Sequence, residues 1–178
     1  SAKPLGQRYN WGKMETMTIG YGHGFAITPI HLALAYSGLL NDGKKLDPKF
    51  LLNTKDSEIK TIIEKKTSDY ISTLLRAVIE ETEFIGPRVK IEGFDIGGKT
   101  GTAELLDNNG QYNKDLNRTI FVGAFPMSKP KFLILTFVDK PKRIKEENHG
   151  ITSGRVNAPL VKNIILRMIE VLNLRKSN

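Results

Sequence analysis

Two apolar segments that follow each other closely in the chain constrain the fold more than any other feature. Segments 119–125 and 131–138 are rich in β-branched and aromatic residues, and five residues containing Pro126 and Pro130 join them. A connection this short between two such segments predicts an antiparallel pair of strands. Because both segments are apolar almost continuously, instead of alternating with polar residues, we expect other elements to cover both faces of the pair.

Three helices are predicted around this pair. The first begins at Thr28-Pro29 and ends at Asn41-Asp42-Gly43; it is apolar nearly all round and is therefore expected to be buried. The second begins near Thr67-Ser68, and the third is expected to be capped by Asn157-Ala158-Pro159. Each of the last two helices carries one apolar stripe. The stripe of the second helix is formed by Ile71, Leu74, Leu75, Val78 and Ile79. The stripe of the third helix is formed by Val161, Ile164, Ile165, Met168, Ile169 and Leu172.

The chain before the first helix is rich in glycine and aromatic residues. Gly20, Gly22 and Gly24 alternate with other residues, so residues 1–27 are predicted to form an irregular, tightly packed segment. The loop from Gly20 to Phe25 either lines a cleft or only permits close packing, and the residues leave both alternatives open.

A further strand is predicted at Gly97–Glu104. Alternation places Lys99 and Gly101 on one face of this strand and Thr100 and Thr102 on the other. The cation and the hydroxyls could hold a carboxylate, Gly101 allows a ligand to come close, and an outward N–H could add a strand-like hydrogen bond to a peptide. The alternative is an edge strand whose lysine only prevents unwanted pairing with other strands.

Composition narrows the classes of function. The 178 residues suffice for one domain with a real core, and no apolar stretch is long enough to span a membrane. The net charge of +8 favours anionic surroundings, but no basic helix with interleaved aromatic residues indicates nucleic-acid binding. The chain has no cysteine, and His23 and His149 have no neighbours at metal-ligand spacing, so we expect neither a metal nor a cofactor.

Three blocks of the sequence, in order, resemble the class B penicillin-binding proteins. Met17 to Tyr36 is similar to their glycine-rich loop and following helix, Gly97 to Ala103 to their Lys-Thr-Gly strand, and His149 to Pro159 to their approach to the C-terminal helix. The resemblance implies an α+β fold with an antiparallel sheet flanked by helices, as in penicillin-binding proteins and serine β-lactamases. It also implies that residues 1–178 are a single partial domain, the C-terminal portion of a transpeptidase domain.

The function implied by the resemblance is that of a peptidoglycan D,D-transpeptidase, which is also the target of β-lactams. By position in the motif, Lys99, Thr100, Gly101 and Thr102 would bind the substrate, with the lysine and the hydroxyls holding its carboxylate, and Lys99 and Thr102 would also take part in catalysis. The expected partners are the D-Ala-D-Ala end of a stem peptide, β-lactams and membrane-bound cell-wall synthesis proteins. The expected location is the periplasmic side of the bacterial inner membrane, with an upstream transmembrane helix as the anchor.

The sequence departs from the family pattern in one important respect. The family's serine nucleophile lies in an S-x-x-K motif followed by S-x-N, and this chain has no S-x-N. Its two S-x-x-K strings, at Ser57 and Ser128, lie in predicted turns, where neither serine can be activated by a buried lysine. The fragment is therefore expected to be inactive alone.

Two alternatives stay open: a non-catalytic cell-wall or β-lactam-sensing module, and a basic scaffold protein with an accidental Lys-Thr-Gly. Strand 131–138 would be an apolar edge, so the isolated chain is also expected to self-associate.

Overall fold

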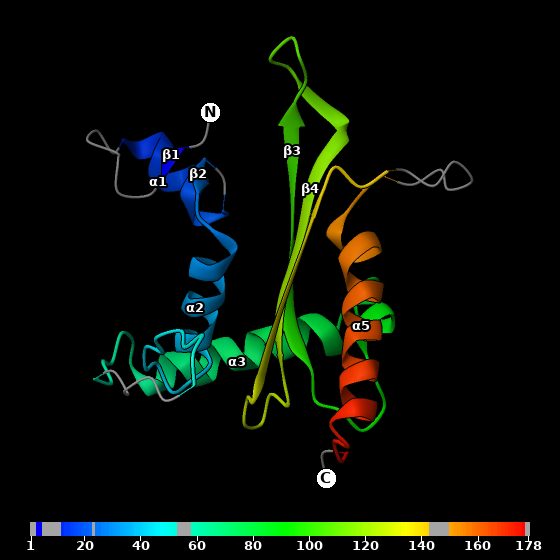
Figure 1. Ribbon diagram of the computed structural model, residues 1–178. Coiled ribbons are helices and arrows are strands. Elements are labelled where there is room, and N and C mark those ends of the chain that lie inside the picture. The colour runs from blue at the N-terminus through cyan, green and yellow to red at the C-terminus, as the bar shows by residue number, and fades with distance from the viewer. Residues whose placement is uncertain (1–2, 5–11, 23, 53–57, 143–149, 177–178) are drawn as a thin grey trace. The chain divides into compact units, whose positions relative to one another are not determined.

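The computed structural model describes residues 3–4, 12–22, 24–52, 58–142 and 150–176 (Figure 1). The chain forms two compact units, Ser1–Leu32 and Ala33–Asn178. The first unit holds β1 (Lys3–Pro4), which pairs in parallel with β2 (Phe25–Ala26), and α1 (Lys13–Gly20). Helix α2 (Pro29–Leu39) begins in the first unit and continues into the second.

Helix α1 corrects the prediction of an irregular segment over residues 1–27. The Gly12 N–H donates to the Glu15 carboxylate at 3.1 Å and so closes the first turn of the helix. The Thr16 hydroxyl donates to the carbonyl of Gly12 at 3.1 Å, which keeps a side chain with little helix preference inside the helical turn. The glycines act only afterwards: Gly22 and Gly24 have φ of +87°, a conformation that ends a helix. His23, Tyr9 and Trp11 lie outside the described residues.

The second unit is built on a three-stranded antiparallel sheet. Its order is β3 (Gly97–Leu106), β4 (Tyr112–Phe125) and β5 (Phe132–Asp139). This arrangement confirms the predicted strand pair and the strand at Gly97. Strand β4 begins well before residue 119, where the predicted segment starts, because backbone pairing with β3 continues into residues that are polar on both faces.

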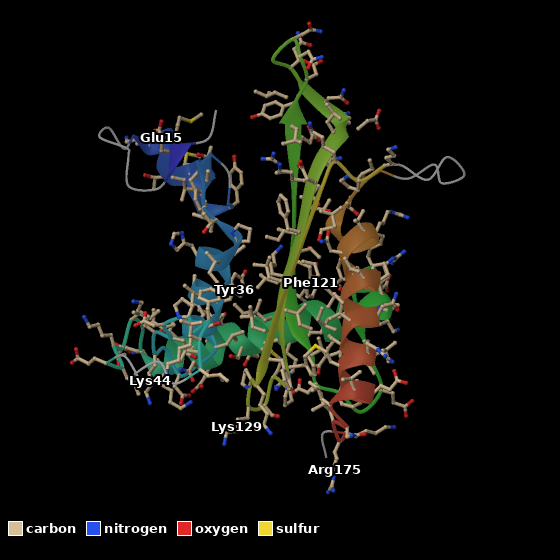
Figure 2. The ribbon with its side chains drawn as sticks, viewed as in Figure 1. Glu15, Tyr36, Lys44, Phe121, Lys129 and Arg175 are labelled. Carbon is tan, nitrogen blue, oxygen red and sulfur yellow. The ribbon has the colours of Figure 1, made fainter. Side chains whose placement is uncertain are left out.

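One face of the sheet packs on α5 (Ser153–Val171), which runs alongside it in Figure 1. Phe121 and Phe125 of β4 are almost completely buried on this face, and Phe121 is labelled in Figure 2. The Phe125 ring stacks on Phe132 of β5 with centroids 5.1 Å apart. The helices α3 (Lys65–Glu80) and α4 (Gly86–Val89) complete this core, whose other buried members are Ile79, Val89, Ile96, Ile134, Ala158, Val161 and Ile165.

The opposite face carries a smaller cluster. Ala124 and Met127 are buried against Leu75 of α3 and Leu40, which directly follows α2, with Tyr36 of α2 packed alongside (Figure 2). Burial on both faces of β4 therefore matches its apolar sequence. The prediction that α2 is a buried helix is wrong for this chain, because only Gly38 among its residues is buried. Its apolar side chains extend all round, and the described elements cover only part of that circumference.

The start of α5 also differs from the prediction. The helix begins at Ser153, with Thr152 at the N-cap, and Pro159 lies inside it. The predicted capping residue Asn157 is completely buried instead, and its amide donates to the Thr136 carbonyl at 3.1 Å and hydroxyl at 3.0 Å. The asparagine failed as a cap because its side chain binds the sheet, a contact that no local pattern reveals.

A partly buried ion pair ties α3 to Asp95, just before β3, and through Asp95 to the turn between β4 and β5. The Arg76 guanidinium donates to the two Asp95 carboxylate oxygens at 2.8 and 2.7 Å, and the Ser128 N–H donates to the same carboxylate at 2.8 Å. The hydrogen bond to Asp95 raises the pKa of Arg76 above its ordinary value. A bidentate pair of this kind fixes geometry as well as adding energy.

The structure confirms the α+β class, with an antiparallel sheet flanked by helices. Within the described ranges, no helix combines the length and the apolar content that crossing a membrane requires.

We expect the isolated chain to self-associate, because β5 pairs only with β4 in the described sheet and Phe137 keeps 48% of its surface exposed. Light scattering over a concentration series at physiological salt should show a rising mass. Phe137→Lys, which puts a charge on this edge strand, should suppress the rise. Leu106→Lys adds the same charge at a residue that is 49% exposed on β3 and should not. A constant monomer mass for the unmodified chain would contradict the prediction.

A second prediction concerns the close contact of β3 with the core. A Cβ at Gly98 would overlap the Phe121 ring and lie 2.9 Å from the Val122 carbonyl, and neither neighbour has room to move. Gly98→Ala should lower the free energy of unfolding by about 2–3 kcal/mol.

Gly101→Ala is the matched control in the same strand. Its Cβ would meet only Cγ2 of the half-buried Ile120, at 2.8 Å, so the loss should be about 1 kcal/mol or less. Chemical denaturation of both variants measures the difference, and equal stabilities would refute the role assigned to Phe121.

Candidate active site

The Lys-Thr-Gly sequence lies near the start of β3, an edge strand of the described sheet. Lys99 pairs with Val122 of β4, and its exposed side chain donates from Nζ to the Thr100 carbonyl at 2.7 Å. Only β4 pairs with β3 in the described sheet, so alternate backbone N–H and C=O groups point away from the sheet along this edge. Such an edge can accept an extended peptide as an additional strand.

The two threonines lie on the face of the sheet that packs on α5. Thr100 pairs with Phe121, which belongs to the core between the sheet and α5. The Thr102 hydroxyl oxygen accepts a hydrogen bond of 2.9 Å from the main-chain N–H of Ser153, the first residue of α5. The orientation of Thr102 is therefore fixed by a contact with the helix, while its side chain stays exposed enough to meet a ligand.

Gly101 has two reasons to lack a side chain. It pairs with Ile120, and a Cβ at Gly101 would lie 2.8 Å from Cγ2 of that residue. The same missing side chain leaves the strand backbone open to a ligand. The sequence predicted only the second reason.

The structure thus brings the four predicted residues together on one strand but divides them between its faces. Lys99 and Gly101 lie on one face, and Thr100 and Thr102 lie on the α5 face, as alternation predicted. Because β3 is an edge, a ligand lying along it can reach both sets. The arrangement offers a cation, two hydroxyls and outward backbone groups, which together suit a carboxylate at the end of an extended chain.

The other candidates lie elsewhere. Ser128 lies in the turn between β4 and β5, where its N–H binds Asp95, and Ser57 lies outside the described residues. The loop from Gly20 to Phe25 belongs to the first unit, and both of its predicted roles stay predictions. Among the described side chains, no group of His, Asp and Glu is arranged to hold a metal ion.

Sequence reasoning missed Ser153, which contacts the site directly. It is 1% exposed, and besides donating its N–H to Thr102 it donates its hydroxyl to the Ile120 carbonyl. The only local signal was a Thr-Ser-Gly string after a charged loop, which does not identify a partner lying in another strand.

Comparison with known proteins identifies the family. Residues 4–166 match the model of the penicillin-binding protein transpeptidase domain. A curated relative, the probable peptidoglycan D,D-transpeptidase PbpC of Pseudomonas aeruginosa, is 27% identical over 94% of this chain. The chain spans only 28% of the length of that relative.

Solved structures agree in fold. Penicillin-binding protein 3 of Mycobacterium tuberculosis, complexed with aztreonam, matches with a TM-score of 0.79 and 22% identity over 95% of this chain and 40% of its own. The transpeptidase domain of Burkholderia pseudomallei penicillin-binding protein 3 matches with a TM-score of 0.77 and 24% identity over 95% of this chain and 50% of its own. With its Lys-Thr-Gly strand and a family match across most of its length, the chain belongs to the transpeptidase domain family of the class B penicillin-binding proteins.

Proposed function

We propose that this chain is part of a peptidoglycan D,D-transpeptidase and supplies the carboxylate-binding edge of its active site. The observation that carries the proposal is the sequence Lys99-Thr100-Gly101-Thr102 on an open strand edge in a chain of this family. The name of the Pseudomonas aeruginosa relative supports the class of substrate.

Binding uses the edge of β3. The stem peptide lies along the strand, and its terminal D-Ala carboxylate accepts hydrogen bonds from Lys99 and the threonine hydroxyls. Each charge-assisted bond is worth about 1.5–3 kcal/mol. Gly101 keeps the backbone close enough for strand-like hydrogen bonds to the peptide. A β-lactam with a carboxylate would occupy the same site, and the complex of the Mycobacterium tuberculosis protein with ampicillin supports this class of ligand.

The chemistry is an acyl transfer in two steps. A serine from outside this chain gives up its hydroxyl proton and attacks the carbonyl carbon of the D-Ala-D-Ala amide, and the C–N bond breaks so that the terminal D-Ala leaves with a proton taken up on its amine. An amine on a neighbouring stem then attacks the ester, and the serine oxygen leaves and regains its proton. In both steps the Thr102 main-chain N–H donates to the carbonyl oxygen as negative charge develops on it. Lys99 contributes positive charge to the proton transfers.

The proposal extends to the setting of the full-length protein. Residues 1–178 form one partial domain, as the 50% coverage of the Burkholderia pseudomallei transpeptidase domain supports. The serine and the S-x-N motif come from the remainder of that domain. The protein acts on the periplasmic side of the inner membrane, anchored by an upstream helix, beside other membrane-bound cell-wall synthesis proteins.

The isolated chain should form no covalent adduct with penicillin, because it lacks an activated serine. Intact-mass measurement after incubation with a fluorescent penicillin tests this. A stoichiometric mass increase would contradict the interpretation of Ser57 and Ser128 as inactive. Reversible binding without an adduct in the full-length protein would favour a sensing module instead.

In the full-length protein, Lys99→Ala should slow acylation by penicillin about 10²-fold or more, because the ligand loses a charge-assisted anchor. Lys162→Ala is the matched control, since this lysine on α5 donates only to the Pro87 carbonyl in the described structure. Stopped-flow acylation rates and thermal melting separate loss of function from loss of fold. A rate for Lys99→Ala within a few-fold of the control would refute the assignment.

A further inference from the structure

The first residue of α5 joins two strands behind the proposed carboxylate site. Ser153 is 1% exposed. Its main-chain N–H donates to the Thr102 hydroxyl oxygen on β3 at 2.9 Å, and its own hydroxyl donates to the Ile120 carbonyl on β4. Ile120 is paired with Gly101, the neighbour of Thr102, so the two contacts of Ser153 lie within one residue of each other along the paired strands β3 and β4.

The direction of the bond to Thr102 has a chemical consequence. A main-chain N–H can only donate, so the Thr102 oxygen must accept from Ser153. The hydroxyl proton of Thr102 therefore points to another partner. An ionised carboxylate can only accept hydrogen bonds, so the contact with Ser153 leaves Thr102 in the state that suits such a ligand.

The backbone of Ser153 is itself held by a buried network. One helical turn later, Asn157 is fully buried and donates to the Thr136 carbonyl at 3.1 Å. The same amide lies 3.5 Å from the carbonyl of Thr119, the residue paired with Thr102. The first turn of α5 is thus fastened to all three strands at the level of the site.

We propose that Ser153 is a positioning residue that sets the Thr102 hydroxyl to donate to the carboxylate of the ligand. This inference rests on the proposed function of the Lys-Thr-Gly strand. Ser153 touches no ligand; it acts through Thr102. Loss of its hydroxyl releases the helix start from Ile120 and lets the N–H move away from Thr102, so that the hydroxyl turns freely.

The test uses the full-length protein and two probes, benzylpenicillin and its methyl ester, which lacks the carboxylate. Ser153→Ala should slow acylation by benzylpenicillin about tenfold, since one oriented charge-assisted bond is lost. Acylation by the ester, slow in every form of the protein, should change less than twofold. Ser72→Ala is the matched control, because the half-buried Ser72 hydroxyl donates only to the Ser68 carbonyl within α3 in the described structure.

A structural effect alone would slow both probes equally and would overturn the proposal. In a Thr102→Val background, which has no hydroxyl to orient, Ser153→Ala should have no further effect on the benzylpenicillin rate. A full tenfold loss there would also overturn it. If thermal melting shows that Ser153→Ala does not fold, the two probes are compared on Ser153→Cys instead. Because cysteine keeps a weak donor, its benzylpenicillin acylation rate should fall between that of the unmodified protein and the tenfold loss.

The outcomes also separate this inference from the proposed function. An unmodified full-length protein that benzylpenicillin does not acylate contradicts the proposed function itself. A protein that is acylated normally and is unaffected by Ser153→Ala contradicts only the role of Ser153.

Discussion

Burial of β4 on both of its faces is the constraint on which the rest of the second unit depends. Phe121 and Phe125 face α5, and Ala124 faces the cluster around Leu75 and Leu40. A strand held from both sides cannot slip in register without moving every apolar side chain to the wrong face. The register of β3 is set by its pairing with β4. The pairing of Thr100 with Phe121 therefore determines which residues of the Lys-Thr-Gly sequence face α5 and which do not.

Buried polar side chains on α5 hold the helix start in place behind the candidate site on β3. Asn157 and Ser153 are buried, and their hydrogen bonds go to backbone and hydroxyl groups of the strands. The Asn157 Oδ1 and Thr119 Oγ1 atoms are buried without a protein partner. Such groups cost free energy that an apolar pair would not. Thr119 is the residue paired with Thr102, and the Asn157 amide lies 3.5 Å from the Thr119 carbonyl, so both groups lie behind the candidate site.

The sequence predicted the elements whose cause is local. The apolar segments of β4 and β5, the stripe of α3 and the strand beginning at Gly97 were all predicted from it, and so were the four residues of the candidate site and their two faces. Contacts between distant parts of the chain were not: Ser153 and Thr102 are 51 residues apart, and Asn157 and Thr136 are 21 apart. The polar half of β4 and the helix α1 were missed for a related reason. Backbone pairing and the Glu15 contact with Gly12, not apolar periodicity, define them.

The division of Lys99 and the threonines between two faces follows from their being consecutive in a strand, and it shapes what the site can do. A carboxylate held from one face alone could lie over the sheet, but one held from both must lie at the edge of β3. An edge ligand is oriented along the strand and so presents its preceding peptide bond to the outward backbone groups of β3. In the proposed binding mode the strand would provide both the anion site and the alignment of the bond to be broken, whereas activation of a nucleophile requires burial of a lysine beside a serine. None of the described serines of this chain has such an environment. Binding geometry and nucleophile activation are thus separate physical requirements, and the proposed function assigns the first to the register of β3 on β4.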